Sequence, residues 1–218
     1  MMLLPWSEIE TVLLDMDGTL LDLHFDNYFW LEYLPHCYCK AYKVSYSQAK
    51  ALIDQECKKV QGTLDWYCLD YWTKLLGLPI IELKQDIANR IQWRKNTELF
   101  LARINEMGKQ VVLITNAHPS SLALKRSKVN LDPWFDTILS AHDYGYPKES
   151  QIFWARLQQQ IGFNPEKTLF IDDSLSVLKS AQEYKIKYIY TVLEPDTQQK
   201  PQKNNNEFGI IKDYANCF

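Results

Sequence analysis

The sequence at residues 11–20 is TVLLDMDGTL, an apolar run that ends abruptly in two acids and a glycine. Thr11–Leu14 has no polar alternation, which is typical of a strand buried on both faces of a parallel sheet. Asp15 and Asp17 follow at once, and in an extended chain both side chains point the same way. Gly18 then permits a sharp turn away from the sheet. The segment therefore predicts a central strand whose carboxyl end carries two carboxylates.

Four further short runs are rich in Val, Ile and Leu and are expected to be strands of the same sheet: Val111–Ile114, Thr137–Leu139, Thr168–Ile171 and Tyr188–Val192. Helical patterns lie between the later runs, and two of them end at Gly108 and Gly162. This alternation predicts an α/β fold with a doubly wound, Rossmann-like parallel sheet. The last segment, 208–218, is a short apolar end to which we assign no strand.

Residues 23–94 contain no strand-like run, and helical spacing dominates there. Ser47 is the expected N-cap of one of these helices. We therefore expect a helical cap domain, 23–94, inserted into a catalytic core formed by 1–22 and 95–218. Aromatic side chains at helical spacing are usually buried. One or two of three cap rings are nevertheless expected to face the cleft: Tyr28, Trp66 and Tyr67.

Acidic side chains follow two of the expected strands, and ligands bind at the carboxyl edge of such sheets. A lone Asp-x-Asp is usually a solvated strand end. Here Asp172 and Asp173 would join Asp15 and Asp17, and four carboxylates that close cannot all stay ionised without compensation. A hard, oxygen-rich site of this kind suits Mg²⁺. Lys148, expected to open the helix after the third strand, would add a second positive charge.

These groups match the needs of phosphoryl transfer. An ionised, desolvated carboxylate can attack phosphorus and form an acyl-phosphate, and Asp15 is placed for that role. Asp17 is the candidate that protonates the leaving oxygen and later activates water. Mg²⁺, Lys148 and the Thr115 hydroxyl would neutralise and position the transferring phosphate. The expected substrate is therefore a small phosphomonoester.

The sequence resembles the phosphatases of the haloacid dehalogenase superfamily, whose four motifs occur here in order. They correspond to DMDGT at residues 15–19, Thr115-Asn116, Lys148 and Asp172-Asp173. The resemblance implies that Asp15 is the nucleophile and Asp17 the general acid and base. It also implies that Mg²⁺ is held by Asp15, the Asp17 backbone carbonyl and the two fourth-motif acids. True dehalogenases of this superfamily lack an acid at the position of Asp17, which favours phosphoester chemistry.

Segments in both the core and the expected cap resemble bacterial GMP/IMP nucleotidases: DMDGTLLDL, FDNYFW, LDWYCLDYW, TNAHP, GYPKE and TLFIDDS. That resemblance implies a purine 5′-nucleotidase. The alternatives are a sugar-phosphate phosphatase or β-phosphoglucomutase-like enzyme on the same core, and a catalytically silent binding protein. The candidate substrate-binding residues are Asn27, Arg94, Asn116 and Lys148, although an arginine such as Arg94 is more often a solvated surface residue. His118 could contact the ligand or cap the helix that follows it.

Composition excludes several other functions. The net charge of -3 offers no basic surface for nucleic acid. The apolar runs are too short to cross a membrane. Five cysteines, an odd number without framework spacing, indicate reduced thiols and a cytoplasmic protein. A zinc site at Cys37 and Cys39 is not favoured, because no second Cys or His pair has suitable spacing. We expect a monomer or a weak dimer.

Overall fold

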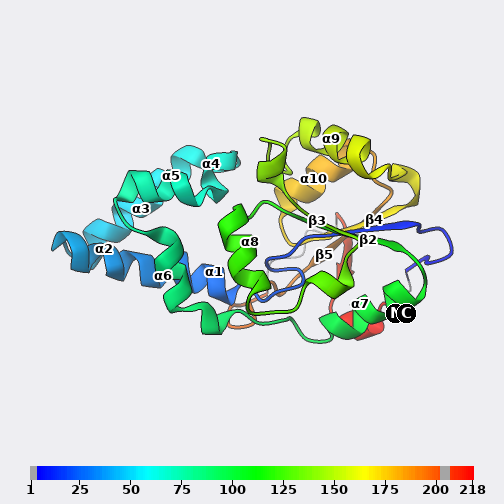
Figure 1. The fold of residues 1–218 in the computed structure, drawn as a ribbon, viewed down its shortest axis with the longest axis horizontal. Coiled ribbons are helices and arrows are strands. Elements are labelled where there is room, and N and C mark those ends of the chain that lie inside the picture. The colour runs from blue at the N-terminus through cyan, green and yellow to red at the C-terminus, as the bar shows by residue number, and fades with distance from the viewer. Residues whose placement is uncertain (1–3, 202–206) are drawn as a thin grey trace.

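The computed structural model describes residues 4–201 and 207–218 (Figure 1). A six-stranded parallel sheet in the order β3-β2-β1-β4-β5-β6 forms its centre. The strands are β1 (Thr11–Leu14), β2 (Gln110–Thr115), β3 (Thr137–Ser140), β4 (Thr168–Asp172), β5 (Tyr188–Val192) and β6 (Gly209–Ile211). The α/β fold with a doubly wound parallel sheet is thus confirmed, and β1 lies inside it as the sequence predicts.

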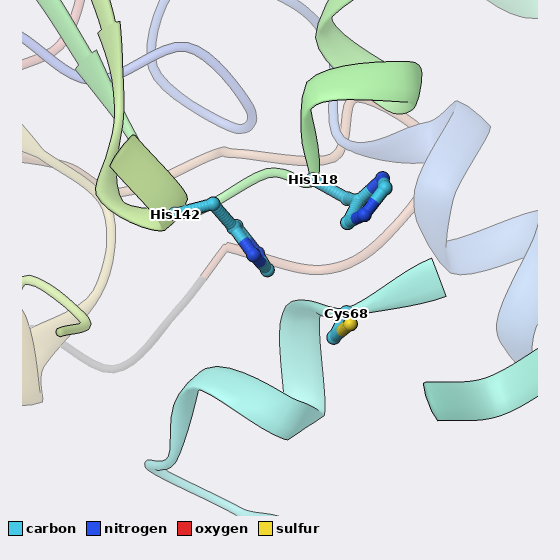
Figure 2. Close-up of side chains that lie close together, drawn as sticks. All are labelled: Cys68, His118 and His142. Carbon is cyan, nitrogen blue, oxygen red and sulfur yellow. The ribbon is translucent and has the colours of Figure 1, made fainter. Parts of the chain in front are cut away.

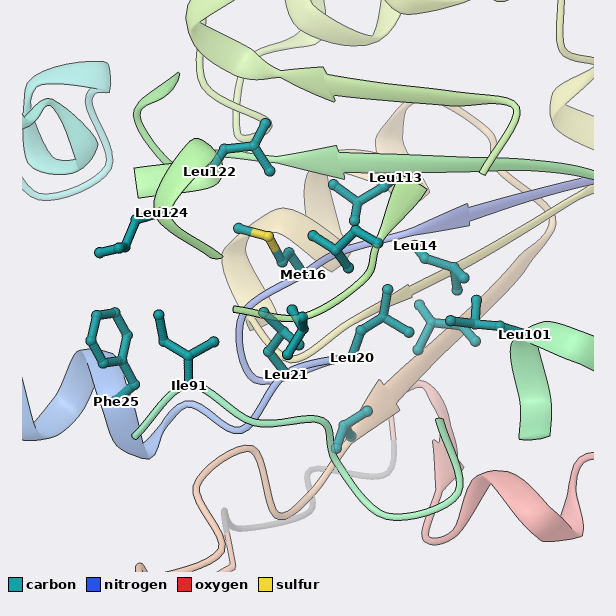
Figure 3. Packing of buried hydrophobic residues seen from close by; sticks show 14 of the residues in the cluster. Leu14, Met16, Leu20, Leu21, Phe25, Ile91, Leu101, Leu113, Leu122 and Leu124 are labelled. Atoms are coloured by element: carbon teal, nitrogen blue, oxygen red, sulfur yellow. The ribbon is translucent and has the colours of Figure 1, made fainter. Parts of the chain in front are cut away.

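Four helices cover the two faces of the sheet: α7 (Thr97–Glu106) and α8 (Pro119–Arg126) on one, α9 (Gln151–Ile161) and α10 (Leu175–Glu183) on the other (Figure 1). Successive residues of β1 serve opposite faces, because strand side chains alternate. Leu14 packs with Leu101 and Leu113 in the cluster under α7 and α8 (Figure 3). Leu13 packs in the cluster under α9 and α10. The strand is therefore buried on both sides.

Between β1 and α7 the chain forms a helical arm that extends to one side of the sheet (Figure 1). Its elements are α1 (His24–Tyr28), the π-helical turn η1 (Phe29–Tyr33), α2 (Leu34–Tyr42), α3 (Tyr46–Val60), α4 (Leu64–Tyr67), α5 (Leu69–Leu76) and α6 (Ile80–Asp86). The expected N-cap at Ser47 is wrong. Ser45 caps α3 instead, because its side chain accepts the Gln48 N–H while the Gln48 side chain accepts the Ser45 N–H.

The chain enters and leaves the helical arm through two segments that lie side by side. Leu21 bridges to Trp93 in an antiparallel sense, and the Asp22 N–H donates to the Gln92 carbonyl at 3.0 Å. The Arg94 N–H donates to the Leu20 carbonyl at 2.9 Å. This paired connection lies at the edge of the sheet that carries Asp15. The division into a cap, 23–94, and a core formed by 1–22 and 95–218 stays a prediction, and 1–3 and 202–206 lie outside the described residues.

The five strands expected from the sequence are confirmed, whereas β6 was missed. It has only three residues and begins at a glycine, so it carries little apolar signal. Gly209 is needed there because the Tyr190 ring covers the position, and a Cβ would come within 2.4 Å of it. No helix among residues 4–201 and 207–218 is long and apolar enough to span a membrane.

Candidate active site

Three carboxylates meet where β1 and β4 end. Leu14 pairs with Ile171 in the sheet, so the next residues, Asp15 and Asp172, lie side by side. Asp173 follows directly. One carboxylate oxygen from each of the three lies within 4.8 Å of the others. Asp15 and Asp172 are buried and Asp173 is half-buried, so water screens their mutual repulsion poorly.

The Lys148 ammonium lies between two of these acids. Its Nζ donates to Asp15 Oδ1 at 2.5 Å and to Asp172 Oδ2 at 2.7 Å. The turn that carries it is held in place by two hydrogen bonds: Asn116 Oδ1 accepts the Lys148 N–H at 2.9 Å, and Trp154 Nε1 donates to the Lys148 carbonyl at 2.8 Å. The expectation that Lys148 opens the helix after the third strand is wrong, because α9 begins at Gln151 with Ser150 as its N-cap.

The charges at this edge do not balance within the protein. Burial raises the pKa of Asp15 to about 6; the ammonium of Lys148 opposes this shift, and the charge of Asp172 adds to it. Burial, with the charges of Asp172 and Asp15, raises the pKa of Asp173 well above its usual range. Three carboxylates face one ammonium, which contacts only Asp15 and Asp172 of the three, so the donor set has an excess of negative charge and of oxygen ligands. These residues fit a hard divalent cation.

Asp17 has a different cationic partner, which the sequence analysis missed. Lys125 Nζ lies 2.6 Å from Asp17 Oδ2 and 2.8 Å from Asp26 Oδ2. Lys84 Nζ donates to the other oxygen of Asp26 at 2.7 Å. Both lysines are buried, and Lys125 lies on the buried face of α8. In the sequence, the only sign of a buried charge was that Lys125 falls on the apolar face of the helix. Its acidic partners lie in other segments of the chain.

This network of Asp17, Lys125, Asp26 and Lys84 joins the end of β1 to the helical arm. Burial raises the pKa of Asp17 to about 6, while the ammonium of Lys125 opposes the shift. The two lysines hold the pKa of Asp26 well below its usual range, in spite of its burial. Asp17 Oδ1 is buried and has no hydrogen-bond partner among the described residues, so one oxygen of this carboxylate is not engaged by the protein.

Gly18 is required by the close packing of this edge. Its φ of +85° lies in the left-handed region, which glycine adopts without strain. A Cβ at this position would lie 2.6 Å from Asp173 Oδ2 and 3.0 Å from the Pro195 side chain. This glycine of the first motif therefore lets the turn after β1 approach Asp173 of the fourth motif.

A cavity of about 320 Å³ opens above these groups, between the sheet edge and the helical arm. The core contributes eight of the polar residues discussed here: Asp15, Asp17, Thr115, Asn116, Lys125, Lys148, Asp172 and Asp173. The arm contributes three aromatic rings, those of Trp30, Trp66 and Tyr67. The expectation for Trp66 and Tyr67 is thus met. Tyr28 instead packs under the Arg90 guanidinium, 3.8 Å from ring centroid to Cζ, and Trp30 was missed.

The candidate substrate-binding residues have separate locations. Asn27 lines the cavity and donates to Asp196 Oδ2 at 2.8 Å. Asn116 lines it too, but both its amide atoms bind neighbouring residues, Lys148 and Glu149. Arg94 is outside the cavity: its guanidinium donates to the Glu194 carbonyl and borders a different pocket. His118 caps α8, since its Nδ1 accepts the Ser120 N–H.

Comparison with known families agrees with this geometry. The family model of the haloacid dehalogenase-like hydrolases matches residues 9–184, which includes all four motifs and the helical arm. The chain therefore belongs to the haloacid dehalogenase-like hydrolases, and it is an enzyme of the hydrolase class.

Individual relatives extend the likeness over nearly the whole chain. The GMP/IMP nucleotidase YrfG of Escherichia coli (strain K12) is 44% identical over 194 residues, which cover 89% of this chain and 87% of that protein. Two solved structures share the fold at lower identity. A HAD phosphatase from Thermococcus onnurineus has a TM-score of 0.79 at 18% identity, with 95% of each chain covered. The putative HAD-hydrolase YfnB of Bacillus subtilis, bound to magnesium, has a TM-score of 0.65 at 17% identity and covers 95% of this chain and 96% of its own.

Replacing Lys125 tests the buried charge network. Lys125→Met leaves the Asp17 and Asp26 carboxylates close together without their shared ammonium, so we expect unfolding free energy to fall by about 3–5 kcal/mol. Urea denaturation followed by circular dichroism measures this. Lys128→Met, at an exposed position just after the same helix, is the matched control and should change stability by less than about 0.5 kcal/mol. Equal stability of the two variants would show that Asp17 and Asp26 are not both ionised in the folded protein.

Proposed function

We propose that this hydrolase is a 5′-nucleotidase that cleaves purine nucleoside monophosphates, GMP and IMP, into nucleoside and phosphate. The observation that carries the proposal is the 44% identity to the GMP/IMP nucleotidase YrfG over 89% of the chain, because that span includes the helical arm as well as the core. The arm supplies the cavity wall opposite the acids, where a substrate's leaving group would lie. Similarity of the arm therefore bears on substrate choice.

Asp15 is the proposed nucleophile. One carboxylate oxygen attacks the phosphorus of the monoester, the bond between phosphorus and the ribose 5′-oxygen breaks, and an aspartyl-phosphate forms. Asp17 gives its proton to the departing oxygen, which leaves as the nucleoside hydroxyl. Asp17 then takes a proton from a water molecule, whose oxygen attacks phosphorus. The bond to Asp15 breaks, and inorganic phosphate and the free carboxylate are regenerated.

Three neighbouring groups support these steps. Lys148, 2.5 Å from Asp15, holds the attacking carboxylate and faces the oxygens of the transferring phosphate. Thr115 lines the cavity at the end of β2 and offers its hydroxyl to the same phosphate. Lys125 acts as a positioning residue: its contact of 2.6 Å with Oδ2 fixes the carboxylate of Asp17 and leaves Oδ1 for the proton transfer.

The same edge would hold Mg²⁺. Asp15, Asp172 and Asp173 offer carboxylate oxygens, and the Asp17 backbone carbonyl is the proposed fourth protein ligand. Bound there, the ion offsets the charge of the phosphate and of the carboxylates. The excess negative charge of the three acids supports this assignment, as does the approach of Gly18 to Asp173.

Aromatic side chains above the acids suit a purine base. Trp30, Trp66 and Tyr67 line the cavity, and the rings of Trp66 and Tyr67 stack with centroids 5.7 Å apart. Base stacking on such a ring contributes about 1–3 kcal/mol, a gain that a sugar phosphate cannot match. Tyr67 is fixed by its hydroxyl, which donates to Glu149 Oε1 at 2.8 Å. Asn27, which also lines the cavity, is the proposed contact for the polar part of the nucleoside.

Asp15→Asn should abolish turnover and leave the fold intact. The amide has almost the shape of the carboxylate but is a far weaker nucleophile, so kcat for GMP should fall by about 10³-fold or more. Steady-state release of phosphate measures the loss, and a thermal melt checks the fold. Asp65→Asn, at an exposed position of α4, is the control and should keep full activity. Wild-type-like turnover by Asp15→Asn would exclude the covalent route.

Removal of divalent cations should stop hydrolysis reversibly. With chelator, the excess charge of Asp15, Asp172 and Asp173 remains uncompensated, and GMP turnover should fall to background. Added Mg²⁺ should restore it. Asp173→Asn should raise the Mg²⁺ concentration needed for half-maximal activity by about tenfold or more. An unchanged rate after exhaustive chelation would rule out the metal requirement.

A panel of phosphomonoesters tests the substrate class. We expect kcat/KM for GMP and IMP to exceed that for pyrimidine nucleotides and for glycolytic sugar phosphates by at least about tenfold, because a purine has a larger ring surface to stack on the aromatic wall than a pyrimidine, and a sugar has none. Glucose 1-phosphate and ribose 5-phosphate serve as comparison substrates of similar charge. A preference for a sugar phosphate would replace the nucleotidase proposal with the sugar-phosphate alternative, and activity on none of them would favour a binding protein.

A further inference from the structure

A second group of metal-binding side chains lies beside the active-site cavity. Cys68, between α4 and α5, comes close to His118 at the start of α8 and His142 in the turn after β3 (Figure 2). One ligand atom from each lies within 4.8 Å of the others. The two imidazole rings have centroids 5.0 Å apart and are nearly perpendicular, at 79°. The cysteine belongs to the helical arm, whereas both histidines belong to the sheet edge.

His142 is oriented as a metal ligand. Its Nε2 is buried and has no hydrogen-bond partner among the described residues. The backbone carbonyl of Asn116 lies near the same ring. A proton on Nδ1 would leave the lone pair on Nε2, and a backbone carbonyl beside the other nitrogen is the usual support of a metal-binding histidine.

His118 and Asp70 complete the surroundings. The Nε2 of His118 lies 3.6 Å from the carboxylate of Asp70, which is largely exposed and free to move. The Nδ1 of His118 accepts the Ser120 N–H over 3.3 Å, a long hydrogen bond. Coordination through Nε2 would place the ring proton on Nδ1 and give up that weak contact. Asp70 or water can then fill a fourth position.

We propose that Cys68, His118 and His142 form a binding site for Zn²⁺, a borderline-soft cation that accepts sulfur and nitrogen ligands, and that the ion ties the helical arm to the sheet edge. The donor set of one sulfur and two imidazoles differs from the all-oxygen set of Asp15, Asp172 and Asp173, so the two sites select different ions. Tetrahedral Zn²⁺ needs ligand atoms about 3.3–3.6 Å apart, so side-chain shifts of about 1 Å complete the site. The metal displaces the thiol proton of Cys68 when it binds.

The location of the site gives it a consequence for turnover, and this part rests on the proposed function. Tyr67 and Leu69, on either side of Cys68, line the active-site cavity, and so does Ala117 next to His118. A bound ion would therefore join the two walls of the cavity at its rim. Substrate entry and product release require the walls to separate, and a step of this kind often limits turnover. Zn²⁺ at this site should slow GMP hydrolysis.

Direct binding of the metal tests the site independently of catalysis. The full chain is titrated with ZnCl₂ by calorimetry in excess MgCl₂, which keeps the acidic site filled, and with CoCl₂ to detect the charge-transfer absorption of a sulfur–cobalt bond. We expect one equivalent of Zn²⁺ to bind, and Cys68→Ser and His142→Ala to weaken binding by at least about tenfold. The cobalt–sulfur band should be absent in Cys68→Ser. Cys57→Ser, at a half-buried cysteine of α3, is the matched control and should bind as the wild type does.

Several outcomes would overturn the proposal. They are Zn²⁺ binding that survives Cys68→Ser, a cobalt complex without a sulfur band, or no binding by a wild-type protein whose melting curve shows it to be folded. The effect on turnover is scored separately: Zn²⁺ should inhibit the wild type and the Cys57→Ser control but spare Cys68→Ser. If the protein lacks nucleotidase activity altogether, the calorimetric and spectroscopic results still decide whether the site exists.

Discussion

Carboxylates that converge at one edge of a parallel sheet impose the constraint on which the rest of this site depends. Asp15 and Asp172 are neighbours because β1 and β4 are in parallel register, with Leu14 opposite Ile171. Burial there makes each negative charge costly. The protein compensates with two buried ammonium groups, Lys148 and Lys125, and leaves the remaining excess for a cation.

The two lysines divide the acids into functional pairs. Lys148 contacts Asp15, the proposed nucleophile, and Asp172. Lys125 contacts Asp17 and, on its other side, Asp26 from the first helix of the arm. The carboxylate proposed to transfer protons is thereby linked to the helical arm that lines the cavity. Movement of the arm would disturb this contact.

The helical arm does more than lie over the cavity, because several of its side chains contact the sheet edge directly. The arm reaches the sheet edge through Tyr67 with Glu149, Asn27 with Asp196, and the group of Cys68, His118 and His142. Each of these pairs joins residues remote in sequence. The paired connection at Leu21 and Trp93 is held by backbone hydrogen bonds and by the side-chain contact of Gln92 with Asp22, so the arm is fixed at its base as well as over the cavity.

Local patterns in the sequence were enough to predict the fold class and most of the catalytic edge. The strand runs, the motif at residues 15–19 and the acids at 172 and 173 each carry their signal within a few residues, because strand burial and turn geometry are local properties. Register then follows from topology, since parallel strands bring their carboxyl ends together. Five of the six strands could be predicted for this reason; β6, with three residues, was too short to give a pattern.

Only the tertiary structure decided which side chains from distant segments meet. Lys125 and Lys84 looked like ordinary helical lysines, and their burial depends on Asp17 and Asp26. The Cys68, His118 and His142 group has no spacing motif, because its members come from three separate elements. Arg94 was predicted to contact the substrate, but it does not line the cavity. Its guanidinium donates to the Glu194 carbonyl instead. Side-chain partners across elements depend on three-dimensional packing, which neighbouring residues in the sequence do not encode.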